Sequence, residues 1–376
     1  MFEPPVTLSR AATPARPTGV TREDILRQGR TLAGTLERIV ESRASLPSAG
    51  HVLFTGCGAS FYAAQGAASL LAALTGTDAT AAPSSEIWLI PELYLRPDTV
   101  VVALSRTGTT TEVVRVLELA RARGLRSVAI SLGTDVPIYE LADDHVALTH
   151  VGEVGRVMTQ SFANLLLAAQ ALAVRTAAQA GSVAGGAYES ALPDVVAAIA
   201  ALTDGFDTSA QACAAQRSGH YVFCGSGPAA AVCSQAVLMM QEMTQLPSES
   251  AGGLEYRHGP IAGLGAESLL CLVSSPRSTP FDVLLAQDAL VLGHQPLVLA
   301  ATASLPLFPD GCATIELPDG LPAWLYGNVA LPFLQLLCYH RTVALGANPE
   351  AVRNLDRNTD PHVDPHVVSL TLDGAR

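Results

Sequence analysis

The chain repeats one short pattern in its two halves. Residues 52–60 (VLFTGCGAS) and 221–229 (YVFCGSGPA) each combine an apolar run, a Gly-x-Gly turn and the start of an Ala-rich segment. This pattern is typical of a buried strand that enters a tight turn and then a helix. Because the two copies lie 169 residues apart, they indicate duplication of a whole α/β domain and not a short solenoid repeat.

The rest of each half alternates short apolar runs with segments of helical periodicity, which is typical of parallel βαβ units. We predict strands at 51–55, 99–104, 127–131, 220–224, 269–274 and 296–300. We predict helices at 21–45, 157–178, 188–217, 230–245 and 324–344, two further helices that end at 74 and 123, and a flexible break at 181–186.

Composition excludes several classes of protein. The 376 residues are 49% hydrophobic and 15% charged, which suits two packed domains. The apolar runs are interrupted before the roughly 20 residues that span a bilayer, and no secretory signal is visible at the N-terminus. The net charge of −12 disfavours nucleic acid and anionic membranes as partners. The seven cysteines are odd in number and never spaced as CxxC, so we expect reduced thiols in a cytoplasmic protein.

All 22 basic residues are arginine, so the chain contains no lysine. A mechanism that needs a lysine Schiff base is therefore excluded.

The segment 105–112 (SRTGTTTE) is the first candidate site. It follows an apolar strand and precedes a helix, and ligands of open α/β sheets bind at the carboxyl ends of strands. Five hydroxyl residues in seven positions, with Gly108 and Arg106, exceed what a simple helix cap needs. Hydroxyls and the free amides of a helix N-terminus suit an anion, so the loop predicts a phosphate site.

Other motifs are weaker. Neither Gly-x-Gly turn has the third glycine or the downstream acidic residue of a dinucleotide fold. No GxSxG motif supports a hydrolase triad. His362 and His366 are four apart, but Pro365 between them blocks the helix that would align them, so we expect no metal site there.

The second candidate site lies between residues 235 and 260. Gln235, Met239 and Glu242 share one face of an apolar helix, where an unpaired carboxylate is costly and is often a catalytic base. A solvent-facing or N–H-paired glutamate is the alternative. His258, between Arg257 and Gly259 in a loop, is placed to transfer protons near neutral pH.

Together, the paired βαβ units, the SRTGTTTE loop and the EYRHGP segment at 255–260 resemble sugar isomerase (SIS) domain proteins. The similarity is greatest to the isomerase half of glucosamine-6-phosphate synthases, and extends to tagatose-6-phosphate ketose/aldose isomerases and fructosamine-6-phosphate deglycases. The resemblance implies two tandem SIS domains, each a parallel-sheet αβα sandwich of flavodoxin-like type. We expect an arm at 1–20, domains at 21–200 and 201–346, and a tail at 347–376 that contributes to the active site.

The resemblance also implies roles for individual residues. Glu242 matches the base that moves a proton between C1 and C2, and His258 matches the residue that opens the sugar ring, reaching the partner's site in a homodimer. Arg357 stands where the synthase tail has its Schiff-base lysine. The implied substrate-binding and phosphate-binding residues are Gly58, Ser60, Ser105, Arg106, Thr107, Thr110, Thr159 and Glu255.

The sequence departs from the synthase pattern at several points. Met239 and Arg357 replace lysines, Gln235 replaces a carboxylate, and we expect no glutamine-hydrolysing domain. These features favour a cofactor-free isomerase or amino-sugar-phosphate deaminase that acts on a hexose 6-phosphate by proton transfer. A phosphosugar sensor without catalytic activity is the alternative.

Overall fold

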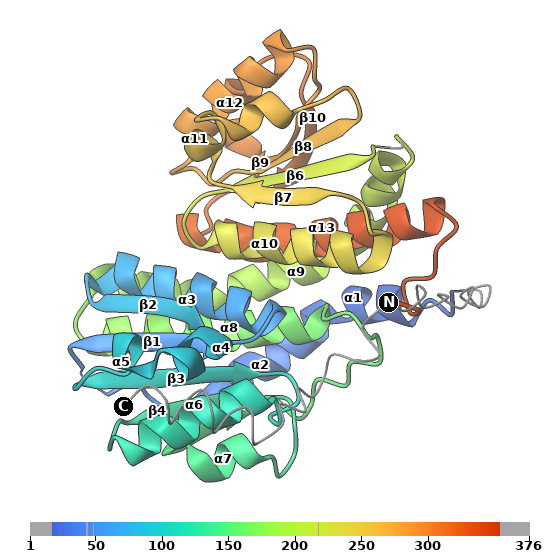
Figure 1. Ribbon diagram of the computed structural model, residues 1–376. Helices are drawn as coiled ribbons and strands as arrows, with labels where there is room; N and C mark the ends of the chain where they lie inside the picture. The colour runs from blue at the N-terminus through green and yellow to red at the C-terminus, as the bar shows by residue number, and fades with distance from the viewer. Residues whose placement is uncertain (1–16, 43, 48, 217, 354–376) are drawn as a thin grey trace, which may run out of the picture.

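The computed structural model describes residues 17–353 except 43, 48 and 217. These residues form two parallel five-stranded sheets, one in each half of the chain (Figure 1). The first sheet contains β1 (His51–Gly56), β2 (Asp78–Pro83), β3 (Thr99–Ser105), β4 (Ser127–Ser131) and β5 (Asp144–Ala147). The second contains β6 (His220–Gly225), β7 (Ser248–Ala251), β8 (Ser268–Val273), β9 (Leu297–Ala301) and β10 (Ala313–Leu317).

Both sheets have the same topology. The strand orders are β2-β1-β3-β4-β5 and β10-β9-β8-β6-β7, so within each half the order along the chain is 2-1-3-4-5. That is the flavodoxin-like order. Neighbouring strands within both sheets run parallel to each other. The two halves of the chain therefore share one sheet topology.

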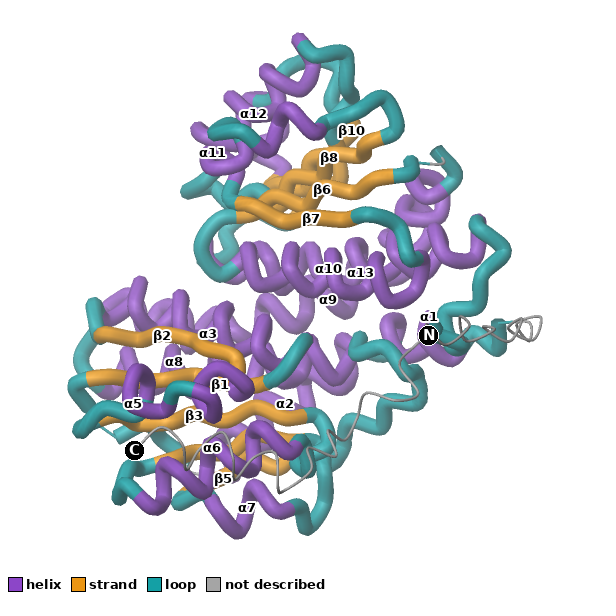
Figure 2. Tube along the Cα trace, in the orientation of Figure 1, coloured by secondary structure: helices purple, strands orange, loops and turns teal. Residues whose placement is uncertain are grey.

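Helices cover both faces of each sheet (Figure 2). The first half and its leading segment contain α1 (Val20–Leu26), α2 (Gln28–Ser42), α3 (Ala59–Thr75), α4 (Ser84–Leu89), α5 (Pro91–Tyr94), α6 (Thr111–Ala122), α7 (Pro137–Leu141) and α8 (Gln160–Gln179). After these come α9 (Val183–Ala214), α10 (Ala229–Thr244), α11 (Gly253–Tyr256), α12 (Thr279–Val291) and α13 (Tyr326–Ala344). Three 3-10 turns lie at η1 (Pro260–Gly263), η2 (Thr302–Leu307) and η3 (Ala323–Leu325).

The main core lies between the two sheets. Their facing sides pack on α2, α3, α8, α9, α10 and α13 in one continuous apolar cluster. Two smaller clusters lie on the outer faces, under α6 in the first half and under α11 and α12 in the second. Burial of apolar surface in these layers is the main force that holds the two halves together.

One predicted helix and one predicted break differ from the structure. The helix predicted at 21–45 is interrupted at Arg27, because the buried Gln28 amide donates to the Ile25 carbonyl (3.0 Å) and takes a helix acceptor. The break predicted at 181–186 is shorter in the structure, at residues 180–182, since α9 already begins at Val183 and the Ser182 hydroxyl caps it by accepting from Gly185 N (3.1 Å).

The long helix α9 joins the two halves. It packs against α2 and α8 on one side and against α13 on the other. The domain boundary predicted between residues 200 and 201 falls inside this helix.

Within the described residues, α8 is long and apolar enough to cross a membrane by length and composition. However, 83% of its most apolar window is buried inside the protein, as expected of a core helix.

The loop from β5 to α8 is fixed by a buried carboxylate. Asp24, on α1, is fully buried and accepts hydrogen bonds from the backbone N–H groups of Val154 (2.9 Å) and Gly155 (2.6 Å). It also accepts from the Gln160 amide (2.8 Å) and pairs with Arg27. Backbone donors of an irregular loop need such partners when water is excluded.

We expect Asp24→Ala to lower the free energy of unfolding by about 3 kcal/mol, because it leaves several buried donors without an acceptor. Urea unfolding measures the effect. Glu41→Gln is the matched control, since its pair with Arg38 (3.3 Å) is exposed and is worth about 1 kcal/mol or less. Equal losses in the two variants would show that Asp24 does not anchor the loop.

Candidate active site

The hydroxyl-rich loop between β3 and α6 folds back on itself. The hydroxyls of Ser105 and Thr110 lie 3.0 Å apart, and Ser105 Oγ accepts from Gly108 N (3.0 Å). Gly108 has φ +71°, a left-handed conformation that glycine adopts without strain. Thr107 is exposed at the outer rim of this loop, and its hydroxyl accepts a hydrogen bond from the Thr109 hydroxyl (3.0 Å). The sequence therefore predicted the position of this loop correctly, at the carboxyl end of a strand.

The neighbouring strand brings a further hydroxyl to the same edge. Strand β1 pairs with β3, and a Cβ added at Gly56 would lie 2.8 Å from Ser60 Cβ and 2.9 Å from the Leu104 carbonyl oxygen. Ser60 is thus beside the end of β3, in the first turn of α3. The N-termini of α3 and α6 both begin at this edge, and helix N-termini favour anions.

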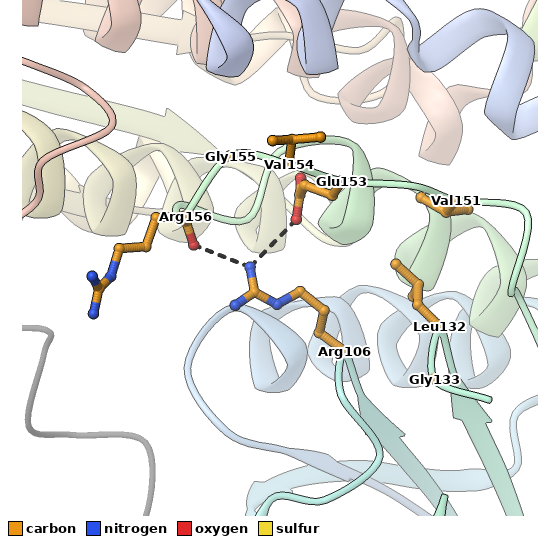
Figure 3. A pocket seen from close by; sticks show the side chains of 8 residues that line it. All are labelled: Arg106, Leu132, Gly133, Val151, Glu153, Val154, Gly155 and Arg156. Atoms are coloured by element: carbon orange, nitrogen blue, oxygen red, sulfur yellow. Dashed lines mark hydrogen bonds and ion pairs between the residues drawn. The ribbon is translucent and has the colours of Figure 1, made fainter. Parts of the chain in front are cut away.

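Arg106 reaches away from the loop and toward the segment before α8 (Figure 3). Its Nη1 donates to Glu153 Oε2 (3.4 Å) and to the Arg156 carbonyl (3.0 Å). Its side chain is one-third exposed, whereas that of Glu153 is 3% exposed. The contacts that the structure shows for Arg106 are therefore with this segment, and its predicted role as a phosphate ligand stays a prediction.

Glu153 accepts several hydrogen bonds at the start of α8. Its carboxylate accepts from Thr159 N (2.7 Å), from the Thr159 hydroxyl (2.9 Å) and from Ser161 N (3.2 Å), and it also pairs with the Ser161 hydroxyl. A carboxylate at a helix N-terminus satisfies orphan N–H groups and complements the helix dipole. Glu153 thereby fixes both Thr159 and Arg106.

A cavity of about 490 Å³ adjoins Arg106. Its walls come from the end of β4, at Leu132 and Gly133, and from Val151 to Arg156 (Figure 3). Of the predicted binding residues, Arg106 lines it. The guanidinium is thus accessible from this cavity.

Glu242 lies on the face of α10 that is turned to the first half. On the same face, Gln235 is fully buried and its amide donates to the Met158 carbonyl of the first half (2.8 Å). Helix α10 also packs against α3. Burial raises the pKa of Tyr62, on α3, and the charge of Glu242 adds to that rise. The carboxyl group therefore lies in the seam between the halves.

The environment of Glu242 shifts its proton affinity strongly. Burial raises its pKa from 4.5 to about 7, and the positive charge of Arg106 offsets part of the rise. A carboxyl group with a pKa near neutrality can both accept and return a proton at physiological pH. Because Arg106 directly follows Ser105, Glu242 and the hydroxyl loop share one region of the molecule.

The structure does not bring His258 and Glu242 of one chain together. His258 and Glu255 are exposed in the segment that begins with α11. The neighbouring Tyr256 belongs to the apolar cluster on the outer face of the second sheet, whereas α10 packs on the inner face. The second sheet therefore separates the two residues.

The structure describes only some of the remaining residues that the sequence singled out. Gly58 lies in the turn before α3 with φ +53°, whereas Arg357, His362 and His366 lie outside the described residues. Within residues 17–353, where described, no group of three or more His, Cys, Asp or Glu side chains could hold a metal ion. Sequence reasoning did not assign roles to Tyr62 and Glu153, and no local motif marks either one.

The raised pKa of Glu242 predicts a pH-dependent stability. A carboxyl whose pKa is higher in the folded than in the unfolded state stabilises fully below about pH 4.5 and loses that contribution as pH rises through 7. We expect Glu242→Gln to gain stability relative to the native chain by about 2–3 kcal/mol between pH 4.5 and 8. Urea unfolding across this range measures it, with exposed Glu118→Gln as control. A difference that stays constant with pH would contradict the assignment.

Comparison with known proteins adds independent information. Residues 45–175 match the family model of the SIS domain. The glutamine–fructose-6-phosphate aminotransferase (isomerizing) of Aeropyrum pernix is 27% identical over 349 residues, covering 89% of this chain and 56% of that protein. The chain thus spans about half the length of the curated relatives it matches.

Solved structures show the same fold over nearly the whole chain. The C-terminal domain of a glucosamine-fructose-6-phosphate aminotransferase from Francisella tularensis superposes with a TM-score of 0.79 at 19% identity, covering 90% of this chain and 99% of that one. A glucosamine-6-phosphate deaminase from Thermotoga maritima gives 0.73 at 23% identity, covering 90% and 98%. The chain therefore carries a SIS domain over residues 45–175, and the resemblance to SIS domain proteins seen in its sequence is confirmed.

Proposed function

We propose that this protein is a phosphosugar isomerase, or an amino-sugar-phosphate isomerase and deaminase, that acts at C1 and C2 of a hexose 6-phosphate. The observation that carries the proposal is the position of Glu242 in the seam between the halves, where burial raises its pKa to about 7 and the charge of Arg106 offsets part of the rise. The names of the similar proteins support the substrate class.

The phosphate would bind at the edge formed by β1 and β3. Ser60, Ser105 and Thr110 supply hydroxyls there, Thr107 lies at the rim, and Gly58 leaves the turn open to the ligand. The N-termini of α3 and α6 add aligned N–H groups, which stabilise a dianion. This end of the substrate is bound and positioned, and takes no part in bond making or breaking.

The carbon chain would extend from this edge toward Glu242 and Thr159. Glu242 takes a proton from C2 of an aldose, or C1 of a ketose, and returns it to the neighbouring carbon through an enediol. An amino sugar forms an enolamine by the same step. Protonation of the neighbouring carbon converts the enolamine into an imine. Addition of water to this imine then releases ammonia.

Arg106 would stabilise the negative charge that develops on the enediolate oxygen. It is the cation whose charge lowers the pKa of Glu242, and the buried Glu153 fixes its guanidinium. Charge that is already in position before the reaction stabilises a transition state more than mobile charge does, because nothing has to reorganise. Since the chain contains no lysine, this arrangement works without a lysine imine, and Arg357 would contribute charge from the tail.

We further propose that the second half is a second SIS domain. Its sheet has the same strand order as the first, and its Gly-x-Gly turn lies at the equivalent place after β6. The two domains would occupy about 21–200 and 201–346, with α9 packed against both and the tail at 347–376.

The active site would be completed by a second copy of the chain. His258 and Glu255 are exposed, and the apolar side chains of Leu254, Phe281 and Leu284 beside them are 41%, 49% and 39% exposed. A homodimer that covers this surface would bring His258 of one subunit to Glu242 of the other. His258 would then open the sugar ring. The seven free cysteines agree with a cytoplasmic location.

Solvent exchange tests the proton transfer directly. Incubation with a panel of hexose and amino-hexose 6-phosphates in deuterated water should place label at C1 or C2 of at least one sugar. We expect Glu242→Gln to lower the exchange rate by about 10²- to 10⁴-fold, and Glu118→Gln to leave it unchanged. Exchange by Glu242→Gln at the native rate would refute the base, and binding of a sugar phosphate without any exchange would favour the sensor alternative.

Mixed dimers test the shared site. The Glu242→Gln variant and the His258→Asn variant should each fail to convert a sugar phosphate that is supplied in its ring-closed form. When the two are unfolded and refolded together, half of the dimers are hybrids with one intact site, so about a quarter of the native activity should return. Coupled measurement of product formation checks this. If the mixture stays inactive although hybrids form, the two residues do not share a site across the interface.

A further inference from the structure

The second half contains a counterpart of the hydroxyl loop. Residues Ser274 to Thr279 lead from β8 into α12, as Ser105 to Thr110 lead from β3 into α6, and the residue numbers differ by 169 throughout. The hydroxyls of Ser274 and Thr279 lie 3.1 Å apart, which matches the 3.0 Å between Ser105 and Thr110. The duplicated fold has thus kept one pair of equivalent contacts.

This second loop is bonded to itself. Ser275 N donates to the Ser278 hydroxyl (3.0 Å), Ser278 N donates to the Ser275 hydroxyl (3.3 Å), and the Thr279 hydroxyl donates to the Ser275 carbonyl (2.8 Å). All these side chains are buried. The first loop is also bonded to itself, but its Thr107 and Thr109 are exposed, so an anion has less access to the hydroxyls of the second loop.

A carboxylate lies close to the hydroxyls of this loop. Asp282 stands in the first turn of α12, where the first half has Val113. It is 3% exposed, and among the described residues its Oδ2 has no hydrogen-bond partner. Its Oδ1 is so close to α11 that a Cβ added at Gly253 would lie 2.6 Å away. Burial raises the pKa of Asp282, and the hydroxyls of Ser274 and Ser278 offset part of that rise.

The Gly-x-Gly turn of the second half, which follows β6, is also covered. A Cβ added at Gly58 in the first half would meet nothing within 4 Å, but one added at the equivalent Gly227 would lie 2.9 Å from the Trp324 ring. The guanidinium carbon of Arg277 lies 5.2 Å from the centre of that ring. In addition, Ala229 stands where the first half has Ser60. The first turn is open, whereas an aromatic side chain lies against the second.

We propose that the second half retains the frame of a phosphosugar site in which the Asp282 carboxylate takes the place of the phosphate, so that each chain binds one phosphosugar, in its first half. A carboxylate at a helix N-terminus is favoured by the helix dipole. It would also repel a dianionic ligand at the same place. The count of one ligand per chain rests on the proposed function of the first half; the closed second site does not.

Phosphate binding tests the proposal in four proteins built on Trp88→Phe, which leaves Trp324 as the single tryptophan of the two in the chain. Calorimetry with inorganic phosphate at pH 8 should count one site per chain in this background and two in Asp282→Ala. It should count none in the double variant Ser105→Ala, Thr110→Val, and one when all three changes are combined. Trp324 fluorescence should respond to phosphate only when Asp282 is replaced.

Asp282→Ser removes the charge with a side chain too short to fill the same space, and it should give the same fluorescence response if Asp282→Ala does not fold. Circular dichroism checks folding. The proposal is overturned if a folded Asp282 variant binds no additional phosphate, or if the background already binds two. A background that binds none, with one site in Asp282→Ala, would refute the first-half site and the proposed function while leaving the closed second site intact.

Discussion

The segment that precedes α8 is held by buried hydrogen bonds from both halves of the chain. Asp24 accepts from the backbone N–H groups of its central residues. From the second half, Gln235 donates to the Met158 carbonyl (2.8 Å) and Gln335 donates to the Thr159 carbonyl (3.0 Å). Buried polar groups of this kind specify one arrangement, because each alternative leaves a donor or acceptor unpaired. The position of the first-half loop relative to α10 depends on these contacts.

The same segment arranges the charges of the candidate site. Arg106 contacts the buried Glu153 side chain, and its charge lowers the pKa of Glu242. If Arg106 were fully neutralised by Glu153, Glu242 would have only burial to set its proton affinity. Instead, burial dominates and the guanidinium moderates it, which leaves the pKa of Glu242 near neutrality. In a chain without lysine, this arrangement places a carboxyl group with a raised pKa within the electrostatic reach of an arginine.

Much of the fold could be predicted because the central strands are buried on both faces and appear as continuous apolar runs. Strands β1, β3, β4 and β9 were predicted within about two residues. The edge strands β2, β5, β7 and β10 were missed, since most of their residues are only partly buried or exposed and form no continuous apolar run. The same edge exposure permits residues such as Asp78 and Glu249, which weaken the sequence signal of a strand.

Candidate site residues could be named from the sequence where one segment carries the chemistry, and not where several segments meet. The hydroxyl loop and Glu242 were identified from local pattern, because five hydroxyls in a loop and a carboxylate in an apolar helix are unusual. Glu153 and Tyr62 have ordinary local surroundings, and only the fold brings Arg106 to Glu153 and Glu242 close enough to Tyr62 to raise the pKa of its hydroxyl. The separation of His258 from Glu242 by the second sheet likewise follows from topology, which residue spacing does not contain.

In the proposed mechanism, the hydroxyl loop and Glu242 act on the two ends of one ligand. A crystal structure with an open-chain hexitol 6-phosphate would test this arrangement. We predict that the phosphorus atom lies among the Ser60, Ser105 and Thr110 hydroxyls, with C1 or C2 about 3–3.5 Å from the Glu242 carboxylate. Phosphate bound at the loop with the C1–C2 end directed away from Glu242, or phosphate bound elsewhere on the molecule, would contradict it.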